Sequence, residues 1–183
     1  DNKHSSEWVI KNTNKLLQPD EPYYYENATG IKTGSTRAAG DCLVSSASKS
    51  GMNLACIVFK TAENNPIRWT LSKELFEWGY SSFRTVDVST LLLNTEPVKE
   101  SVEGAAAGDS GMLDFNMPEA GSAYATLGKD TVEGILAGTD TVAAEKTWSV
   151  DYPLKAPVAQ DDPLGTVTYR SEATGEVIYT GSL

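Results

Sequence analysis

The feature that most constrains the fold is a pair of β-like runs, 41–48 and 53–60, joined by the tight turn Lys49-Ser50-Gly51-Met52. Ser-Gly between two apolar runs is a signal for a two-residue β-hairpin loop. The preceding segment Gly30–Thr36 is typical of a short strand with glycines near its ends. We therefore expect an antiparallel sheet in this part of the chain.

Both cysteines of the chain, Cys42 and Cys56, lie on this hairpin. With Ser-Gly as the loop, Cys42 faces Phe59 and Cys56 faces Ser45. Because side chains alternate between the two faces of a sheet, a disulfide would need a register slip, and we expect free thiols. The cysteine spacing and the single histidine of the chain also fit no zinc pattern, so we expect no metal and no cofactor.

A helix is predicted after the hairpin. Asn65 can cap it and Pro66 suits its first position, while Gly79 can end it. Apolar residues recur between these points at helical spacing, and we expect this stripe to pack on the sheet. The stripe consists of Ile67, Leu71, Leu75 and Trp78.

The charge balance changes near residue 85. Residues 1–84 carry ten Lys and Arg against nine Asp and Glu, whereas residues 85–183 carry five against sixteen. Such a shift often marks two modules, and we expect one over residues 1–85 and another over residues 86–183. The net charge of −10 argues against a nucleic-acid partner, which would select a basic surface.

The second module is predicted to be rich in β-structure. Short β-like runs recur in it, separated by Gly, Pro and Asp, and this pattern is typical of a small antiparallel sandwich or barrel. The overall fold class is therefore α+β: an antiparallel sheet with a C-terminal helix, followed by a small all-β, sandwich-like domain. The runs are Pro97–Val102, Met112–Met117, Ala123–Leu127, Val132–Ala137, Thr147–Tyr152, Leu164–Arg170 and Glu176–Thr180.

One motif carries chemistry, the triplet Lys32-Thr33-Gly34 on the predicted strand. Alone, such a triplet arises by chance in many proteins. Together with the segments around it, however, it resembles the C-terminal part of serine-type D-alanyl-D-alanine carboxypeptidases, the low-molecular-mass penicillin-binding proteins. The segment Leu154–Leu183 is similar to the β-rich C-terminal module of that family. The matching segments, in order, are Asn12–Leu17, Gly30–Thr36, Ala39–Ala47 and Phe76–Tyr80.

This resemblance implies a role for each residue of the motif. Lys32 would place a fixed positive charge in the cleft, and the backbone N–H of Ser35 would be one oxyanion donor. The resemblance implies substrate-binding roles for four further residues. One of them, Thr13, takes the place of an arginine that helps to hold the substrate carboxylate in some family members, so carboxylate recognition would rest more on Thr33, Ser35 or Thr36. The four substrate-binding residues are Thr13, Thr33, Gly34 and Thr36.

The nucleophile of the family is missing from its usual place. It belongs to a Ser-x-x-Lys helix turn upstream of Lys-Thr-Gly, and none of the 31 residues before Lys32 has that pattern. The one match, Ser46-Ala47-Ser48-Lys49, lies on a predicted strand downstream, and we interpret it as a coincidence. The family's Ser-x-Asn motif is absent too. We therefore expect a C-terminal piece of the enzyme that is inactive alone.

The resemblance implies that the whole enzyme cleaves the terminal D-alanine of peptidoglycan stem peptides through a serine acyl-enzyme. Its partners would be stem peptides, β-lactams and the N-terminal catalytic segment that this chain lacks. The face left open by that segment could be covered by a homodimer or a strand swap. The location implied is the bacterial cell envelope outside the cytoplasm, with the protein either secreted or attached to the membrane.

Two other functions compete with this one. A class A β-lactamase also carries a Lys-Thr-Gly-like strand, but it lacks a β-rich module after the catalytic domain. A non-catalytic cell-surface module for binding or spacing is the interpretation we favour for residues 86–183 alone. The tyrosines Tyr23–Tyr25 are compatible either with an aromatic wall of the substrate groove or with a loop packed on the sheet.

Overall fold

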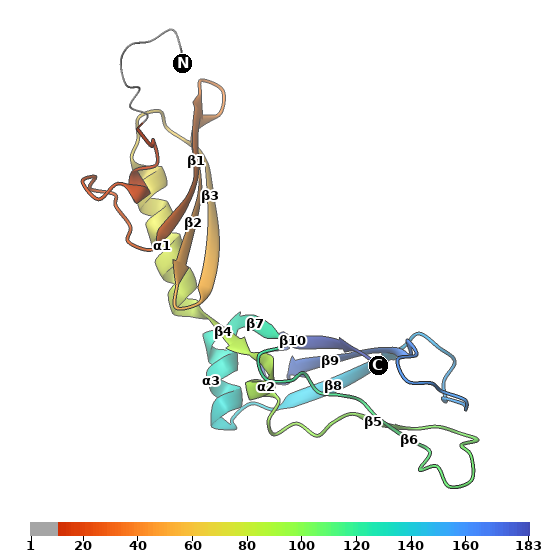
Figure 1. Cartoon of the computed structure of the whole chain (residues 1–183). Helices are drawn as coiled ribbons and strands as arrows, with labels where there is room; N and C mark the ends of the chain where they lie inside the picture. The colour runs from red at the N-terminus through yellow and green to blue at the C-terminus, as the bar shows by residue number, and fades with distance from the viewer. Residues whose placement is uncertain (1–10) are drawn as a thin grey trace, which may run out of the picture. The chain divides into compact units, whose positions relative to one another are not determined.

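The computed structural model describes residues 11–183, and the chain divides into two compact units. The first unit ends at Ser82 and the second comprises Phe83–Leu183. Both combine helices with antiparallel strands (Figure 1). The predicted α+β fold class is confirmed.

The first unit is built on a three-stranded antiparallel sheet. Its strands β1 (Ala28–Thr36), β2 (Gly40–Lys49) and β3 (Met52–Thr61) are ordered β1-β2-β3, so that β1 and β3 are its edges. Helix α1 (Ile67–Ser82) packs along this sheet (Figure 1). The short 3-10 helix η1 (Lys15–Leu17) comes before β1 in the chain. All three strands lie where the sequence predicts them.

The turn of the hairpin is the predicted one. Ser50 and Gly51 connect β2 to β3 with φ angles of 51° and 81°. Two successive residues with positive φ form the type I′ turn that suits the twist of a two-residue hairpin. The turn thereby determines which residues of the two strands face each other.

The two cysteines are free thiols, as predicted. Ser45 lies opposite Cys56, which confirms the predicted register over most of the hairpin. Cys42 itself lies at a register shift, between Asp41 opposite Thr61 and Leu43 opposite Val58, so its predicted pairing with Phe59 stays a prediction. An irregularity of this kind is not visible in the pattern of apolar residues.

Helix α1 presents a different face to the sheet from the one predicted. Three residues of the predicted stripe, Ile67, Leu75 and Trp78, are exposed, whereas the fourth, Leu71, packs against the core. The contact face contains small residues, which let the helix approach closely: a Cβ on Gly79 would come within 2.7 Å of Leu54 Cδ1. Gly79 therefore serves packing and does not end the helix, which continues to Ser82. The buried residues are Trp69, Ser72, Phe76 and Gly79.

The tyrosine segment packs on the first unit's core. Tyr25 is buried and stacks on Phe76 of α1, with ring centroids 5.8 Å apart and planes 7° apart. Tyr23 packs against the same core, whereas Tyr24 is partly exposed. Of the two interpretations of this segment, the structure supports the packed loop.

The second unit contains three small antiparallel sheets and two helices. Strand β4 pairs with β7, β5 pairs with β6, and β9 is the middle strand between β8 and β10. The elements are β4 (Phe83–Asp87), α2 (Val88–Leu91), β5 (Lys99–Ser101), β6 (Met112–Asp114), β7 (Tyr124–Gly128), α3 (Lys129–Ala137), β8 (Val142–Trp148), β9 (Gly165–Ser171) and β10 (Val177–Ser182).

One predicted strand of this unit, 132–137, is wrong, because these residues belong to helix α3. The helix ends at Gly138, which has the left-handed conformation of a helix C-cap, with φ of 71°. Its start depends on a distant residue, since both carboxylate oxygens of Glu176 accept the N–H of Gly128, at 3.1 and 3.2 Å. Nothing near α3 in the sequence indicates that contact.

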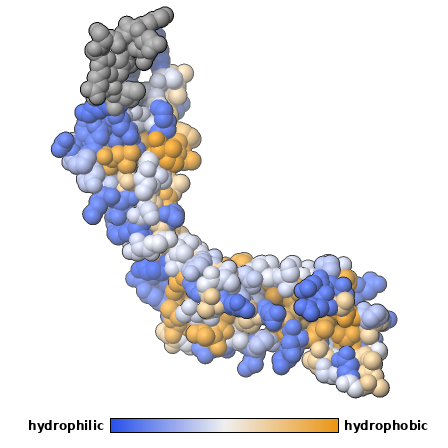
Figure 2. Space-filling model, in the orientation of Figure 1, coloured by the Kyte–Doolittle hydropathy of each residue, from blue (hydrophilic) through white to orange (hydrophobic). Residues whose placement is uncertain are grey.

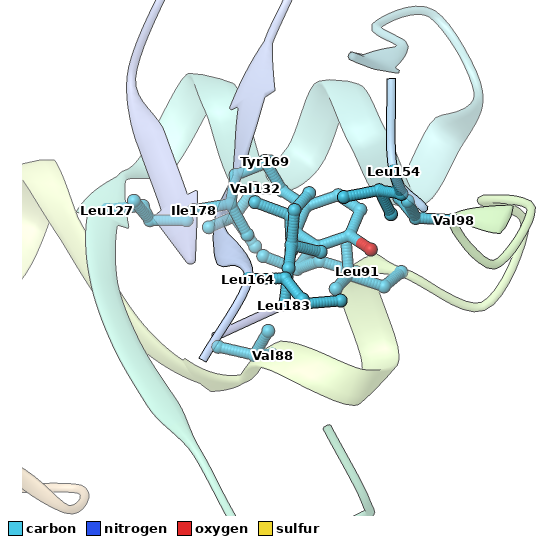
Figure 3. Close-up of a cluster of buried hydrophobic side chains, with 12 residues drawn as sticks. Val88, Leu91, Val98, Leu127, Val132, Leu154, Leu164, Tyr169, Ile178 and Leu183 are labelled. Atoms are coloured by element: carbon cyan, nitrogen blue, oxygen red, sulfur yellow. The ribbon is translucent and has the colours of Figure 1, made fainter. Parts of the chain in front are cut away.

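The second unit has a hydrophobic core of its own. Figure 3 shows side chains from α2, α3 and strands of this unit converging on Tyr169. Burial raises the pKa of the Tyr169 phenol above its usual value. The core is formed by Val88, Leu91, Leu92, Val98, Leu127, Val132, Leu154, Leu164, Val167, Tyr169, Ile178 and Leu183.

Candidate functional site

The predicted site residues lie on β1, the edge strand of the first unit's sheet. An edge strand has backbone N–H and C=O groups that no neighbouring strand uses. Strand β1 is mostly exposed along its length, whereas β2 beside it alternates between buried and half-buried residues. A second peptide could therefore pair with the free edge of β1.

Lys32 projects from the sheet face that α1 does not cover. It pairs with Val44, whose neighbours on β2, Leu43 and Ser45, are the ones buried on the α1 side. The side chain is exposed, and its ammonium donates to the carbonyl of Thr33 at 2.6 Å. No carboxylate within residues 11–183 forms an ion pair with Lys32, so its charge is available to an anionic ligand.

The hydroxyls of Thr13 and Thr33 meet at 2.7 Å. Each hydroxyl has one proton, and a hydrogen bond between the two uses only one of them. The pair therefore keeps one O–H that can donate to a third group. The next residue in the chain, Asn14, is buried and accepts the N–H of Leu16 with its side-chain oxygen at 3.1 Å.

Thr36 ends β1 and offers a second hydroxyl proton. Its oxygen accepts the N–H of Ala39 at 3.0 Å across the turn to β2. An acceptor role leaves the O–H of Thr36 free to donate. Gly40 closes this turn with φ of 65°, and a Cβ there would lie 2.5 Å from the carbonyl oxygen of Thr61, so the turn requires glycine.

At Gly34, unlike at Gly40, the structure does not require a glycine. Its φ is not positive, and a Cβ built on it would meet nothing within 4 Å. Neither the backbone nor the packing of the described residues therefore demands a glycine here. The open space above Gly34 would let the backbone of a bound molecule come close to β1.

Ser35 is bound to a buried carboxylate that the motif does not predict. Its hydroxyl donates to Asp41, the residue opposite it on β2. Asp41 is only 3% exposed and forms an ion pair with Arg68 of α1 at 3.2 Å. The Ser35 hydrogen bond, more than the Arg68 charge, holds the pKa of Asp41 below its usual value. The sequence contains one indication of this contact: Asp41 lies two residues before Leu43, at a position of β2 that faces the core.

Comparisons with known proteins agree with this geometry. A family model described as D-alanyl-D-alanine carboxypeptidase matches residues 1–63, which include all the predicted site residues. The D-alanyl-D-alanine carboxypeptidase DacC of Escherichia coli (strain K12) is 27% identical over 165 residues. This chain is a relative of the D-alanyl-D-alanine carboxypeptidases. The match covers 86% of the chain but 36% of DacC, so the chain spans little more than a third of this relative.

Solved structures show the same relationship. The carboxypeptidase DacD from Francisella tularensis superposes with a TM-score of 0.60 at 24% identity, over 95% of this chain and 38% of DacD. Penicillin binding protein 5 from Haemophilus influenzae superposes with a TM-score of 0.55 at 26% identity, over 85% of this chain and 40% of that one. The shared fold therefore extends over both units of this carboxypeptidase relative.

The Ser-x-x-Lys match downstream of the motif does not form a nucleophile and base. Ser46 hydrogen-bonds to the hydroxyl of Thr29 at 2.8 Å. Lys49 Nζ lies 3.8 Å from a carboxylate oxygen of Glu77 and 5.5 Å from the ring centre of Tyr80, both on α1. A spacing of three on a strand places the two side chains on opposite faces of the sheet. The interpretation of this match as a coincidence is confirmed.

The described residues contain neither a cluster of metal ligands nor a helix able to span a membrane. Within residues 11–183, no three His, Cys, Asp or Glu side chains gather as metal ligands would. None of the helices in that range has the length and apolar character needed to span a membrane.

Proposed function

We propose that this chain forms one wall of the active-site cleft of a serine D-alanyl-D-alanine carboxypeptidase. The whole polypeptide would remove the terminal D-alanine from peptidoglycan stem peptides, outside the cytoplasm, through a serine acyl-enzyme. The observation that carries this proposal is the exposed edge strand β1. On it, Lys32 forms no ion pair with a carboxylate of the described residues, and the space above Gly34 is empty to 4 Å.

Substrate recognition would combine an extended backbone with a terminal carboxylate. The stem peptide would pair with the free edge of β1, as peptides do when they add a strand to a sheet. Gly34 would let it approach, and its carboxylate would accept either the spare O–H of the Thr13–Thr33 pair or that of Thr36, which lies on the other face of β1. Lys32 would supply the positive charge that favours an anionic substrate.

The acylation step would use groups from two stretches of polypeptide. A serine outside this chain would attack the carbonyl carbon of the substrate and release D-alanine. The backbone N–H of Ser35 would donate to the oxyanion that develops. The charge of Lys32 would lower the pKa of the lysine of the Ser-x-x-Lys motif, so that this lysine could accept the serine proton. By itself the chain would then bind weakly and hydrolyse nothing.

The second unit is proposed to have no catalytic part. We propose functional modules at 1–85 and 86–183, the latter serving as a spacer or docking module of the envelope enzyme. Its own buried core supports this division, since a module of this kind needs no contact with the active site to hold its fold. β-Lactams would acylate the enzyme with or without it.

Labelled penicillin tests the proposed function. The polypeptide that joins this chain to a Ser-x-x-Lys segment should become covalently labelled, and Lys32→Ala should slow labelling about 100-fold or more. Lys60→Ala, an exposed lysine at the end of β3, is the matched control and should label like the wild type. Absence of label in the wild type would exclude the carboxypeptidase, and rapid turnover without lasting label would favour a β-lactamase.

A further inference from the structure

The carboxylate of Asp41 connects three elements around the end of β1. It accepts the hydroxyl of Ser35 on β1 and the backbone N–H of Asn64 in the loop before α1, at 3.1 Å for the latter. The guanidinium of Arg68, in the first turn of α1, lies 3.2 Å from it. The carbonyl of Asp41 also accepts the hydroxyl of Thr61 at 3.0 Å. The end of the site strand is thus tied to the core through one buried anion.

This network decides what the Ser35 side chain can donate. A serine hydroxyl has a single proton, and that of Ser35 is used by Asp41. Turning the hydroxyl toward a ligand would remove one of the donors of a carboxylate that is 3% exposed, and an under-satisfied buried charge is costly. A hydrogen bond to a carboxylate is also stronger than one to a neutral acceptor. The hydroxyl of Ser35 is therefore retained by the protein.

The same network occupies Arg68. Its guanidinium is largely buried, lies on the ring of Trp69 at 4.8 Å from the ring centre, and faces Asp41. The ion pair is close but poorly aligned, since Arg68 Nη1 and Nε make no hydrogen bond within the described residues. The positive charge of Arg68 is thus balanced inside the protein, and Lys32 remains the exposed cation of the site strand.

We propose that Asp41 is a positioning residue that holds Ser35 so that its backbone N–H, and not its hydroxyl, faces the reacting group. This inference rests on the proposed carboxypeptidase function and adds one point to it: the carboxylate of the substrate is bound by Lys32 and the threonines, without the Ser35 hydroxyl. Loss of the Ser35–Asp41 bond should therefore affect the rate of acylation and leave substrate binding unchanged.

The test separates these two quantities in the intact polypeptide that contains a Ser-x-x-Lys segment. The dissociation constant and the acylation rate constant are measured with a labelled penicillin, and KM and kcat with a peptide ending in D-Ala-D-Ala. Ser35→Ala should lower the acylation rate constant about 10- to 100-fold and change binding less than twofold, because a misplaced donor costs rate. Ser35→Thr keeps a hydroxyl and should restore most of the rate.

Asp41→Asn should have the same effect as Ser35→Ala, and the double variant should be no slower than either single one, since both remove one interaction. Ser46→Ala removes a hydroxyl of the neighbouring Ser46–Thr29 pair and is the matched control. If Asp41→Asn does not fold, the exposed position Ser35 still decides the question.

Two results would overturn the inference. If Ser35→Ala weakens binding tenfold or more at an unchanged acylation rate, the hydroxyl contacts the substrate directly. If Ser35→Ala acylates like the wild type, Asp41 has no influence on the reaction. In both cases the wild type is still acylated, and the proposed function stands. A wild type that takes no label removes the proposed function itself, and this inference with it.

Discussion

Tyr25 shows how a single side chain makes the first unit sensitive to pH. Its phenol is buried against Phe76 and donates to Glu77 at 2.7 Å. Burial, and then the hydrogen bond to Glu77, raise the pKa of Tyr25 from 10.0 to about 12. Because the folded pKa is the higher one, this group stabilises the fold fully below pH 10 and loses that contribution as the pH rises toward 12.

The expected outcome is a fall in the free energy of unfolding by up to about 2 kcal/mol between pH 9 and pH 12, measured by urea unfolding of this chain. Tyr25→Phe should be less stable at pH 9 and should lose less stability on going to high pH. The matched control is Tyr24→Phe, a partly exposed neighbour, which should keep the wild-type pH dependence. An unchanged slope in Tyr25→Phe would show that another group titrates.

At the scale of elements, the start of α3 depends on one side chain from the loop between β9 and β10. The carboxylate of Glu176 accepts the N–H of the N-cap residue Gly128 and the hydroxyl of Thr131, so the first turn of α3 is bound by a side chain from a distant part of the chain. Glu176→Ala should destabilise the second unit by about 1–2 kcal/mol, measured by thermal unfolding and by hydrogen exchange in α3.

Glu133→Ala is the control for that prediction. Glu133 lies on the same helix in an exposed pair with Lys129 at 3.6 Å. Pairs of this kind contribute little, so the variant should remain within about 0.5 kcal/mol of the wild type. Equal effects of the two glutamates would mean that Glu176 contributes only its charge.

These elements also show what the sequence can predict. The hairpin and the Lys32 strand depend on local signals, a Ser-Gly turn and alternating side chains, and both were predictable. The buried face of α1 and the start of α3 involve contacts with distant residues, Leu54 and Glu176, which local periodicity does not indicate.

The candidate site divides in the same way. Lys32 and its neighbours form a contiguous motif, so the sequence identifies them. The Asp41 network joins Ser35 to Arg68 across three elements, and such a contact exists only once the sheet and α1 are packed.

At the scale of the whole molecule, one sheet face of the first unit is notably apolar. Ile57 is 58% and Phe59 68% exposed on β3, and Figure 2 shows apolar surface on this unit. Ile57 pairs with Val44, which pairs with Lys32, so the apolar residues share a face with the catalytic candidate. The chain spans 36% of DacC and 38–40% of the two solved relatives. We propose that the remaining polypeptide covers this face and brings the nucleophile beside Lys32.

Phe59→Ser tests this proposal in two settings. In the isolated chain, the exposed phenylalanine should favour dimers or strand-swapped forms, and the serine variant should shift sedimentation toward monomer. In the polypeptide that includes the Ser-x-x-Lys segment, Phe59 would be buried, and Phe59→Ser should cost about 3 kcal/mol or more of unfolding free energy. Leu93→Ser, at a 76% exposed position of the second unit, should change neither measurement. If Phe59→Ser leaves the longer polypeptide as stable as before, some other surface receives the nucleophile segment, and Lys32 does not face it.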